Sequence, residues 1–325
     1  MGRHFLLSAA ARTLSLKAIF SGGEDAAYET FRRLRWPETE GEPVCPQCGG
    51  VEAYKITTRR RYKCKACLHQ FSVTSGTIFA SRKLSFMDLL AAISLFVNAV
   101  RGRSSVQLSR EIGVQYKTAW VLAHKLREAL QTEYEGATVS GLVDVDGTLL
   151  GGKPRKSNYH GPGVDPQKGM RNRRRLMAKK VVVAAIRQRG GRTLTFVVKR
   201  EAEAVDIVRK VVQQGSIVFS DEAPHWHVLG RWYQVARVEH AEWFSKDGVH
   251  TNYVESFFSR LGAMVERIHY HVATKYLHRY SAHAAWLEDH RRTPNGTLVN
   301  RLLGAALNAP ISRDFKGYWQ RRQIP

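Results

Sequence analysis

The sequence has few acidic residues and no long apolar run. It contains 28 Asp and Glu against 51 Lys and Arg, which gives a formal net charge of +23. Such an excess points to a polyanionic partner, with nucleic acid ahead of an anionic membrane surface. The longest apolar stretch, residues 89–100, is shorter than the roughly 20 residues that a membrane span requires. We therefore expect a cytoplasmic, nucleoid-associated protein without a membrane partner.

Cysteine is absent outside residues 45–67, which argues against scattered disulfides. The cysteines form two Cys-x-x-Cys pairs separated by fifteen residues. Each pair lets one turn aim two sulfurs at one ion, and two pairs supply the four tetrahedral ligands that Zn²⁺ prefers. The pattern predicts a zinc ribbon at 41–80 with a structural Zn²⁺, the less favoured alternative being disulfides or free thiols. The predicted ligands are Cys45, Cys48, Cys64 and Cys67.

A helical module is predicted at 81–136, after a helical leader at 1–40. Apolar residues recur at intervals of three and four, which is a helical period. A helix, a turn containing Gly113 and a second helix from about Lys117 resemble a helix-turn-helix. Lys117 and Thr118 are of types that contact phosphates and base edges, so we predict that they bind DNA. An ordinary helical hairpin is the alternative.

Strand-like patterns begin after residue 136. Three strands, a helix over 201–214, a fourth strand, and then a strand and a helix match the order of the ribonuclease-H-like fold. The sequence therefore predicts an α/β catalytic domain with a mixed sheet at 137–292 and a tail at 293–325. In that fold the first strand carries Asp146, the fourth ends at Asp221 beside it, and the late helix carries Glu255. Three such carboxylates can hold two Mg²⁺ or Mn²⁺ ions about 4 Å apart, so these acids are the catalytic candidates.

Each of the three acids has a rival. Asp144 shares a strand face with Asp146, because side chains alternate along a strand. We prefer Asp146, since Gly147 follows it and allows a ligand to approach closely, and we expect Asp144 to be an active-site neighbour. The remaining alternatives are Glu222, Asp247 and Glu266.

A strongly basic segment follows the first predicted strand. Residues 151–200 hold 15 Lys and Arg and one acid. The part at 153–180 has little apolar content, so it is interpreted as an inserted loop that lies along the DNA backbone near the acids. Phosphate contacts of this kind position DNA without reading its sequence. The alternative is a solvated loop without a partner. The residues expected to bind DNA are Lys153, Arg171, Arg173, Arg174, Arg175 and Lys179.

Short segments spread from about residue 20 to residue 292 match one known family in their order. They are Leu34-Arg-Trp-Pro37, Gly76-Thr-Ile-Phe79, Tyr116-Lys-Thr-Ala-Trp120, Val145-Asp-Gly-Thr148, Gly151-Gly-Lys153, Ser220-Asp-Glu222 and His250-Thr-Asn-Tyr-Val-Glu255. In these segments the chain resembles the bacterial insertion-sequence DDE transposases that carry an N-terminal zinc ribbon. The resemblance implies metal-dependent cleavage and transfer of the element's own DNA ends into target DNA. It also implies that His250 and Asn252 are active-site neighbours.

The chain departs from the family pattern at two positions. An acid often follows the first catalytic Asp, where this chain has Gly147, and a Lys usually follows the catalytic Glu by seven residues, where it has Gly262. Arg260 and Arg267 are the nearest substitutes for that Lys, and Arg260 is the one expected to bind DNA. The departures leave two alternatives open, a decayed or domesticated DNA-binding regulator and a nuclease that cuts without joining. Because two element ends must be brought together, we expect a homodimer or higher oligomer on double-stranded DNA.

Overall fold

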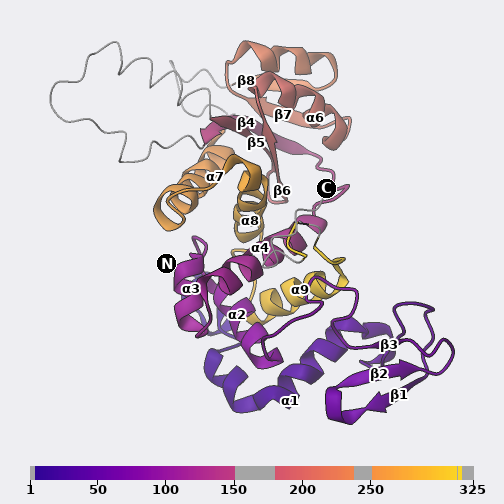
Figure 1. Cartoon of the computed structure of the whole chain (residues 1–325). Helices are drawn as coiled ribbons and strands as arrows, with labels where there is room; N and C mark the ends of the chain where they lie inside the picture. Colours follow the sequence, from indigo (N-terminus) through magenta and orange to yellow (C-terminus); the bar gives the residue numbers. More distant parts are fainter. Residues whose placement is uncertain (1–3, 151–179, 238–250, 313, 317–325) are drawn as a thin grey trace, which may run out of the picture. The chain divides into compact units, whose positions relative to one another are not determined.

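The computed structural model describes residues 4–150, 180–237, 251–312 and 314–316. The chain divides into two compact units (Figure 1). The ribbon unit consists of residues 1–133 and 290–325, and the sheet unit consists of residues 134–289. No helix in the described ranges is long and apolar enough to cross a membrane.

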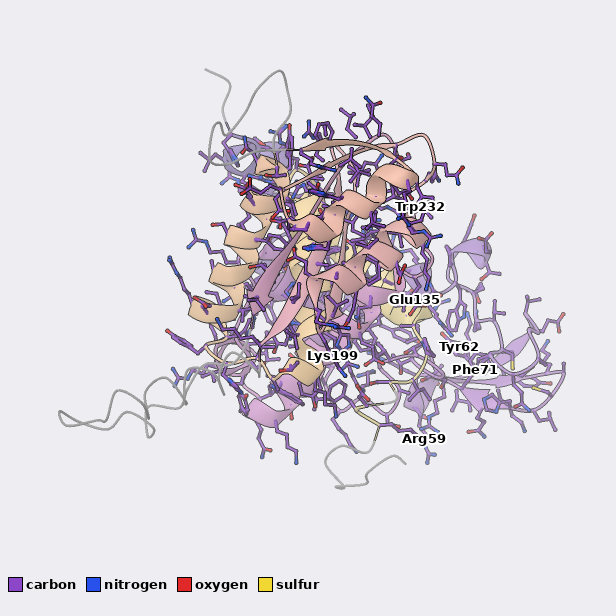
Figure 2. All side chains as sticks on the ribbon, turned by 90° about the horizontal axis from the view of Figure 1, so that it is seen from above. Arg59, Tyr62, Phe71, Glu135, Lys199 and Trp232 are labelled. Atoms are coloured by element: carbon purple, nitrogen blue, oxygen red, sulfur yellow. The ribbon has the colours of Figure 1, made fainter. Side chains whose placement is uncertain are left out.

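A small antiparallel sheet, of order β1-β2-β3, forms the ribbon itself. Aromatic residues form its small core. Tyr62 pairs with Phe71 across β2 and β3 (Figure 2), and their ring centroids are 5.6 Å apart. Trp36 packs edge-on against both rings. So small a core depends on a further constraint, such as a metal, to stay folded. The strands are β1 (Ala53–Ile56), β2 (Arg61–Cys64) and β3 (Gln70–Phe71).

Helices make up the rest of the ribbon unit. Serine side chains cap three of them: the Oγ atoms of Ser15, Ser85 and Ser104 accept from the N–H groups of Ala18, Asp88 and Gln107 at 3.1, 2.9 and 3.1 Å. Each serine satisfies a backbone donor that a helix start leaves unpaired. The helices are α1 (Leu16–Arg35), α2 (Phe86–Asn98), α3 (Ser105–Glu111), α4 (Tyr116–Thr132) and α9 (Asn295–Asn308), with short turns η1 (Phe5–Leu7), η2 (Ala9–Ala11), η3 (Pro37–Thr39) and η4 (Thr57–Arg59).

Helix α9 lies in the segment that the sequence analysis treated as a tail without elements. Its buried side chains include Leu298, Leu302 and Leu303, and it packs against α1, α2 and α4. Asn295 fixes its first turn, because the Asn295 Oδ1 accepts from the N–H groups of Thr13 and Leu14 at 2.9 and 3.0 Å. The segment is therefore a structural part of the ribbon unit.

The sheet unit is built on a mixed five-stranded sheet of order β6-β5-β4-β7-β8. Strands β6, β5 and β4 are antiparallel neighbours, whereas β7 and β8 run parallel to β4. The fold is therefore mixed α/β, with elements in the order that predicts the ribonuclease-H-like fold. The strands are β4 (Leu142–Leu150), β5 (Val181–Gln188), β6 (Thr193–Val198), β7 (Ile217–Ser220) and β8 (Gln234–Arg237).

Helical elements cover both faces of this sheet (Figure 1). Side chains alternate along β5, so Ala184 and Ile186 pack toward α6 and η7, and Val183 and Ala185 pack toward α7 and α8. The alternation explains why the strand reads as one apolar run. The helical elements are η6 (Glu201–Glu203), α6 (Ala204–Val211), η7 (Pro224–Arg231), α7 (Asn252–Ala263), the π-helical turn η8 (Met264–Ile268), η9 (Thr274–Tyr276) and α8 (Leu277–Asp289).

A buried carboxylate ties α8 to the sheet and to α7. Glu288, only 4% exposed in its side chain, accepts from Arg187 Nη2 of β5 at 2.9 Å. It also pairs with Arg260 of α7, whose Nη2 in turn donates to Ser256 Oγ at 2.8 Å. The Arg187 side chain is 13% exposed, so this pair is largely desolvated. Removing one partner of such a pair leaves an uncompensated buried charge.

We expect Glu288→Ala to lower the free energy of unfolding by about 3 kcal/mol, the lower end of the range for breaking a buried pair. The reason is that the Arg187 guanidinium would lose its 2.9 Å carboxylate partner. Calorimetric unfolding of the full chain measures the change. The matched control is Glu203→Ala, which breaks the exposed pair with Arg200, and surface pairs contribute about 1 kcal/mol or less. Equal effects of the two variants would contradict the assignment.

Candidate active site

Two of the predicted acids lie side by side at the carboxyl edge of the central strands. Strands β4 and β7 are parallel, and Asp144 pairs with Phe219. Asp146 lies two residues further along β4, and Asp221 directly follows the end of β7, which brings the two acids close enough to interact. Backbone donors hold both side chains: the Gly147 N–H donates to Asp146 Oδ1 at 2.6 Å, and the Ala223 N–H donates to Asp221 Oδ1 at 3.2 Å. The first and second candidate acids therefore lie beside each other.

Helix α7 brings the third acid. Thr251 precedes the helix, and its Oγ1 donates to Glu255 Oε1 at 2.6 Å. Val254, Phe257 and Leu261 are fully buried in the core under the α7 face of the sheet. Burial of each contributes roughly 2 kcal/mol, which fixes the helix and so places Glu255. Successive side chains of a strand point to opposite faces, and Leu150, four residues after Asp146, packs into this core. Asp144 and Asp146 therefore lie on the same face of β4 as Leu150.

Negative charge is concentrated around Asp146. Burial raises the pKa of Asp146 to about 7, the Gly147 N–H opposes the rise, and the carboxylates of Asp221, Glu201 and Glu255 add to it. Without a cation, the Asp146 carboxyl group would therefore be partly protonated near neutral pH. A divalent cation would remove the like-charge repulsion and keep the carboxylates ionised.

The donor set fits hard divalent ions. It consists of carboxylate oxygens, which Mg²⁺ and Mn²⁺ prefer. In the described part of the chain, the four cysteine sulfurs are the one group of three or more ligand atoms within 4.8 Å of one another, so the acids are spread more widely.

Asp144, the predicted neighbour, is tied into a separate ion pair. Its side chain is fully buried, and its Oδ1 accepts from Arg189 Nε at 2.9 Å. The Arg189 guanidinium also lies over the Phe219 ring, 3.7 Å from its centroid. Asp144 therefore braces the strand from which Asp146 projects.

Glu201 is an acid that the sequence analysis did not select. It begins η6, after β6, and its carboxylate lies close enough to Asp146 and Asp221 to interact with both. His225 Nε2 lies 3.8 Å from Glu201 Oε2. No local sequence motif indicates a functional role for Glu201, because its surroundings predict only the start of a helix.

The other predicted site residues are distributed unevenly. Asn252 is the first residue of α7, and Arg260 is paired with Glu288 and Ser256 inside the sheet unit. The rival Glu266 is exposed in the π-helical turn η8. The remaining residues lie outside the described residues: His250, Asp247, Lys153, Arg171, Arg173, Arg174, Arg175 and Lys179.

The four cysteines form a compact cluster. The Sγ atoms of Cys45 and Cys67, and those of Cys48 and Cys64, are 3.6 Å apart. A tetrahedral ion with Zn–S bonds of about 2.3 Å spaces its sulfurs by about 3.8 Å, so the cluster fits Zn²⁺. Gly50 permits this approach, because a Cβ there would lie 3.3 Å from the Cys64 sulfur.

The predicted helix-turn-helix is formed by α3 and α4. Gly113 lies between them with a φ of +65°, a conformation that glycine adopts without strain. Lys117 and Thr118 are exposed in the first turn of α4. They line an open cavity of about 360 Å³ together with Arg82, Lys83 and Lys125. A basic surface therefore surrounds the start of α4.

The strand order β6-β5-β4-β7-β8 is that of the ribonuclease-H-like fold. The same chain carries a four-cysteine ribbon. Residues 138–289 match the family of the ISXO2-like transposase domain, and residues 22–70 match the transposase zinc-ribbon domain. The chain therefore belongs to the insertion-sequence transposases with an N-terminal zinc ribbon. No curated protein and no solved structure gives a match.

Proposed function

We propose that the chain binds the ends of its own insertion sequence and catalyses metal-dependent DNA cleavage and strand transfer. The observation that carries the proposal is the meeting of Asp146, Asp221 and Glu255 from two strands and a helix within a transposase domain. Mg²⁺ or Mn²⁺ bound by these acids would activate the attacking oxygen and stabilise the leaving oxygen of a phosphodiester. The zinc in the ribbon is structural, because four sulfurs leave no open position for chemistry.

The protein's own groups keep the acids in place. The Gly147 N–H fixes Asp146, the Ala223 N–H fixes Asp221, and the Thr251 hydroxyl fixes Glu255. Each of these bonds is made to a carboxylate oxygen, and such charge-assisted bonds are stronger than neutral ones. Fixed carboxylates reduce the reorganisation needed when metal and DNA bind.

DNA binding is assigned to basic surfaces of the chain. A net charge of +23 favours double-stranded DNA as the partner, and the exposed Lys117 and Thr118 of α4 are suited to phosphate and base contacts. The Arg260 side chain is 41% exposed while it is paired with Glu288, so it is accessible to DNA in this proposal. We expect the active form to be a homodimer or higher oligomer, because one reaction joins two ends.

A second candidate is a DNA-binding regulator that has lost catalysis. It is favoured by Gly262, where the family usually has a Lys and where a side chain would meet open space. This candidate predicts salt-sensitive DNA binding without metal-dependent cleavage.

The test is a cleavage and strand-transfer assay with purified chain, Mg²⁺ or Mn²⁺, and the DNA that flanks its own gene. We expect metal-dependent joining. We expect Asp146→Asn to abolish joining while DNA binding persists, because Asp146 lies among the carboxylates of Asp221, Glu201 and Glu255, where the metal would bind. Binding without any cutting would support the regulator, and cutting without joining would support a nuclease.

A further inference from the structure

We infer that Glu201 is a fourth carboxylate of the divalent-metal site, and that Gly147 is the residue that makes room for it. The inference rests on the proposed function, since it concerns ligands of the same metal. Glu201 begins the short turn η6 between β6 and α6, so it reaches the site from an element that carries none of the three family acids.

The space beside Gly147 is filled by the Glu201 side chain. A Cβ on residue 147 would lie 2.4 Å from Oε1, 2.7 Å from Cδ and 2.9 Å from Cγ of Glu201, closer than real Cβ atoms approach other groups. Any other residue at 147 would therefore displace this carboxylate. The Gly147 N–H, which donates to Asp146, also acts on the Glu201 carboxylate. Two carboxylates thus converge on one backbone donor.

Glu201 and Asp146 approach the edge of the sheet from opposite faces. Successive residues of a strand point to opposite faces, so Asp146 faces α7 whereas position 147 faces α6. Asp221, at the end of the neighbouring strand, interacts with both Asp146 and Glu201. An ion at this edge is therefore offered carboxylates from both faces of the sheet.

Asp146, Asp221 and Glu201 lie close enough to repel one another. His225 is a basic side chain beside these acids. Its Nε2 lies 3.8 Å from Glu201, too far for a hydrogen bond, and one imidazole carries at most one charge against three carboxylates. A divalent cation supplies that charge with the oxygen ligands it prefers.

The experiment measures Mn²⁺ binding to the zinc-loaded full chain by titration calorimetry. We expect Glu201→Gln to weaken Mn²⁺ binding by about 10- to 100-fold, the range seen when groups that support a metal site are removed. The matched control is Glu203→Gln, two residues away in the same turn, whose carboxylate accepts from the Lys199 N–H at 3.1 Å. It should bind Mn²⁺ as the wild type does.

Thermal unfolding separates a ligand from a structural carboxylate. Without metal, Glu201→Gln removes a like charge from an acidic group, so the melting temperature should stay constant or rise. With Mn²⁺, the metal-induced rise should be smaller than in the wild type. If Glu201 instead served to pair with His225, its replacement by Gln would destabilise the metal-free chain.

A positional swap tests the role of Gly147. Gly147→Asp alone should weaken Mn²⁺ binding, because its side chain displaces Glu201. The double variant Gly147→Asp with Glu201→Ala should recover most of the lost affinity, since the new carboxylate takes the vacated place.

The outcomes separate this inference from the proposed function. If Glu201→Gln bound Mn²⁺ as the wild type does while Asp146→Asn did not, Glu201 would not be a ligand and the proposed function would stand. If Asp146→Asn also bound Mn²⁺ normally and no variant cleaved DNA, the proposed function would fail and the inference with it.

Discussion

Replacement of Asp221 by Asn is expected to slow metal-dependent DNA cleavage by at least about a thousandfold, which corresponds to about 4 kcal/mol of transition-state stabilisation. Asp221 follows β7 beside Asp146, so it is placed to share a metal with the first acid. An amide has almost the same shape but no charge, and it loses most of the attraction for a divalent cation. Gel-based cleavage of labelled element ends measures the rate.

The matched control for this substitution is the next residue along the chain. Glu222 is exposed and follows Asp221 beyond the end of β7. Glu222→Gln should therefore cleave at nearly the wild-type rate, and both variants should bind element-end DNA equally well. Wild-type cleavage by Asp221→Asn would remove this residue from the mechanism.

Loss of one zinc ligand is expected to unfold the ribbon. Cys64 is fully buried, and its N–H donates to the His69 carbonyl at 2.9 Å, which shapes the second metal-binding turn. Structural zinc contributes about 10–16 kcal/mol in small zinc domains, far more than the few aromatic contacts of this ribbon can replace. Cys64→Ser should therefore release the zinc. Metal analysis of the purified chain would show this, and hydrogen exchange would show lost protection of the ribbon strands.

His69→Gln provides the control for the zinc prediction. His69 lies two residues after Cys67, and its ring stacks near Phe71, 6.3 Å between centroids. It lies outside the four-sulfur cluster, so the variant should retain one zinc per chain. The sheet unit should melt normally in both variants. A Cys64→Ser chain that kept its zinc would contradict the four-cysteine site.

Much of the fold could be predicted because local signals agreed with the global arrangement. The first predicted strand, which carries Asp146, is β4 (Leu142–Leu150), and the late helix, which carries Glu255, is α7 and begins at Asn252. Apolar alternation and a capping residue are encoded within a few positions, so the sequence alone carries them. Helix α9 was missed although Leu298, Leu302 and Ala306 recur at a helical interval. That signal was present and went unused.

The candidate site was less accessible to sequence reasoning. The three acids could be placed because they follow from the order of strands and helices, and the cysteines because their spacing is local. Glu201 could not, since its position depends on how the turn after β6 folds over β4. The sequence indicated Gly147 as a position that lets a ligand approach and as a missing family acid, whereas the Glu201 side chain, 54 residues away, fills the space beside it. Contacts of this kind arise from tertiary packing.

The packing of α9 into the ribbon unit has a consequence for synthesis. Residues 134–289 are translated between the two parts of the ribbon unit, and α9 leaves the ribosome after them. Domains generally fold as units when their whole sequence has emerged. The sheet unit, with Asp146, Asp221 and Glu255, is therefore complete before the helical core beside the α3–α4 surface can close. A nascent chain therefore completes the unit with the candidate metal-binding acids first, and the core that supports the proposed DNA-contacting helices last.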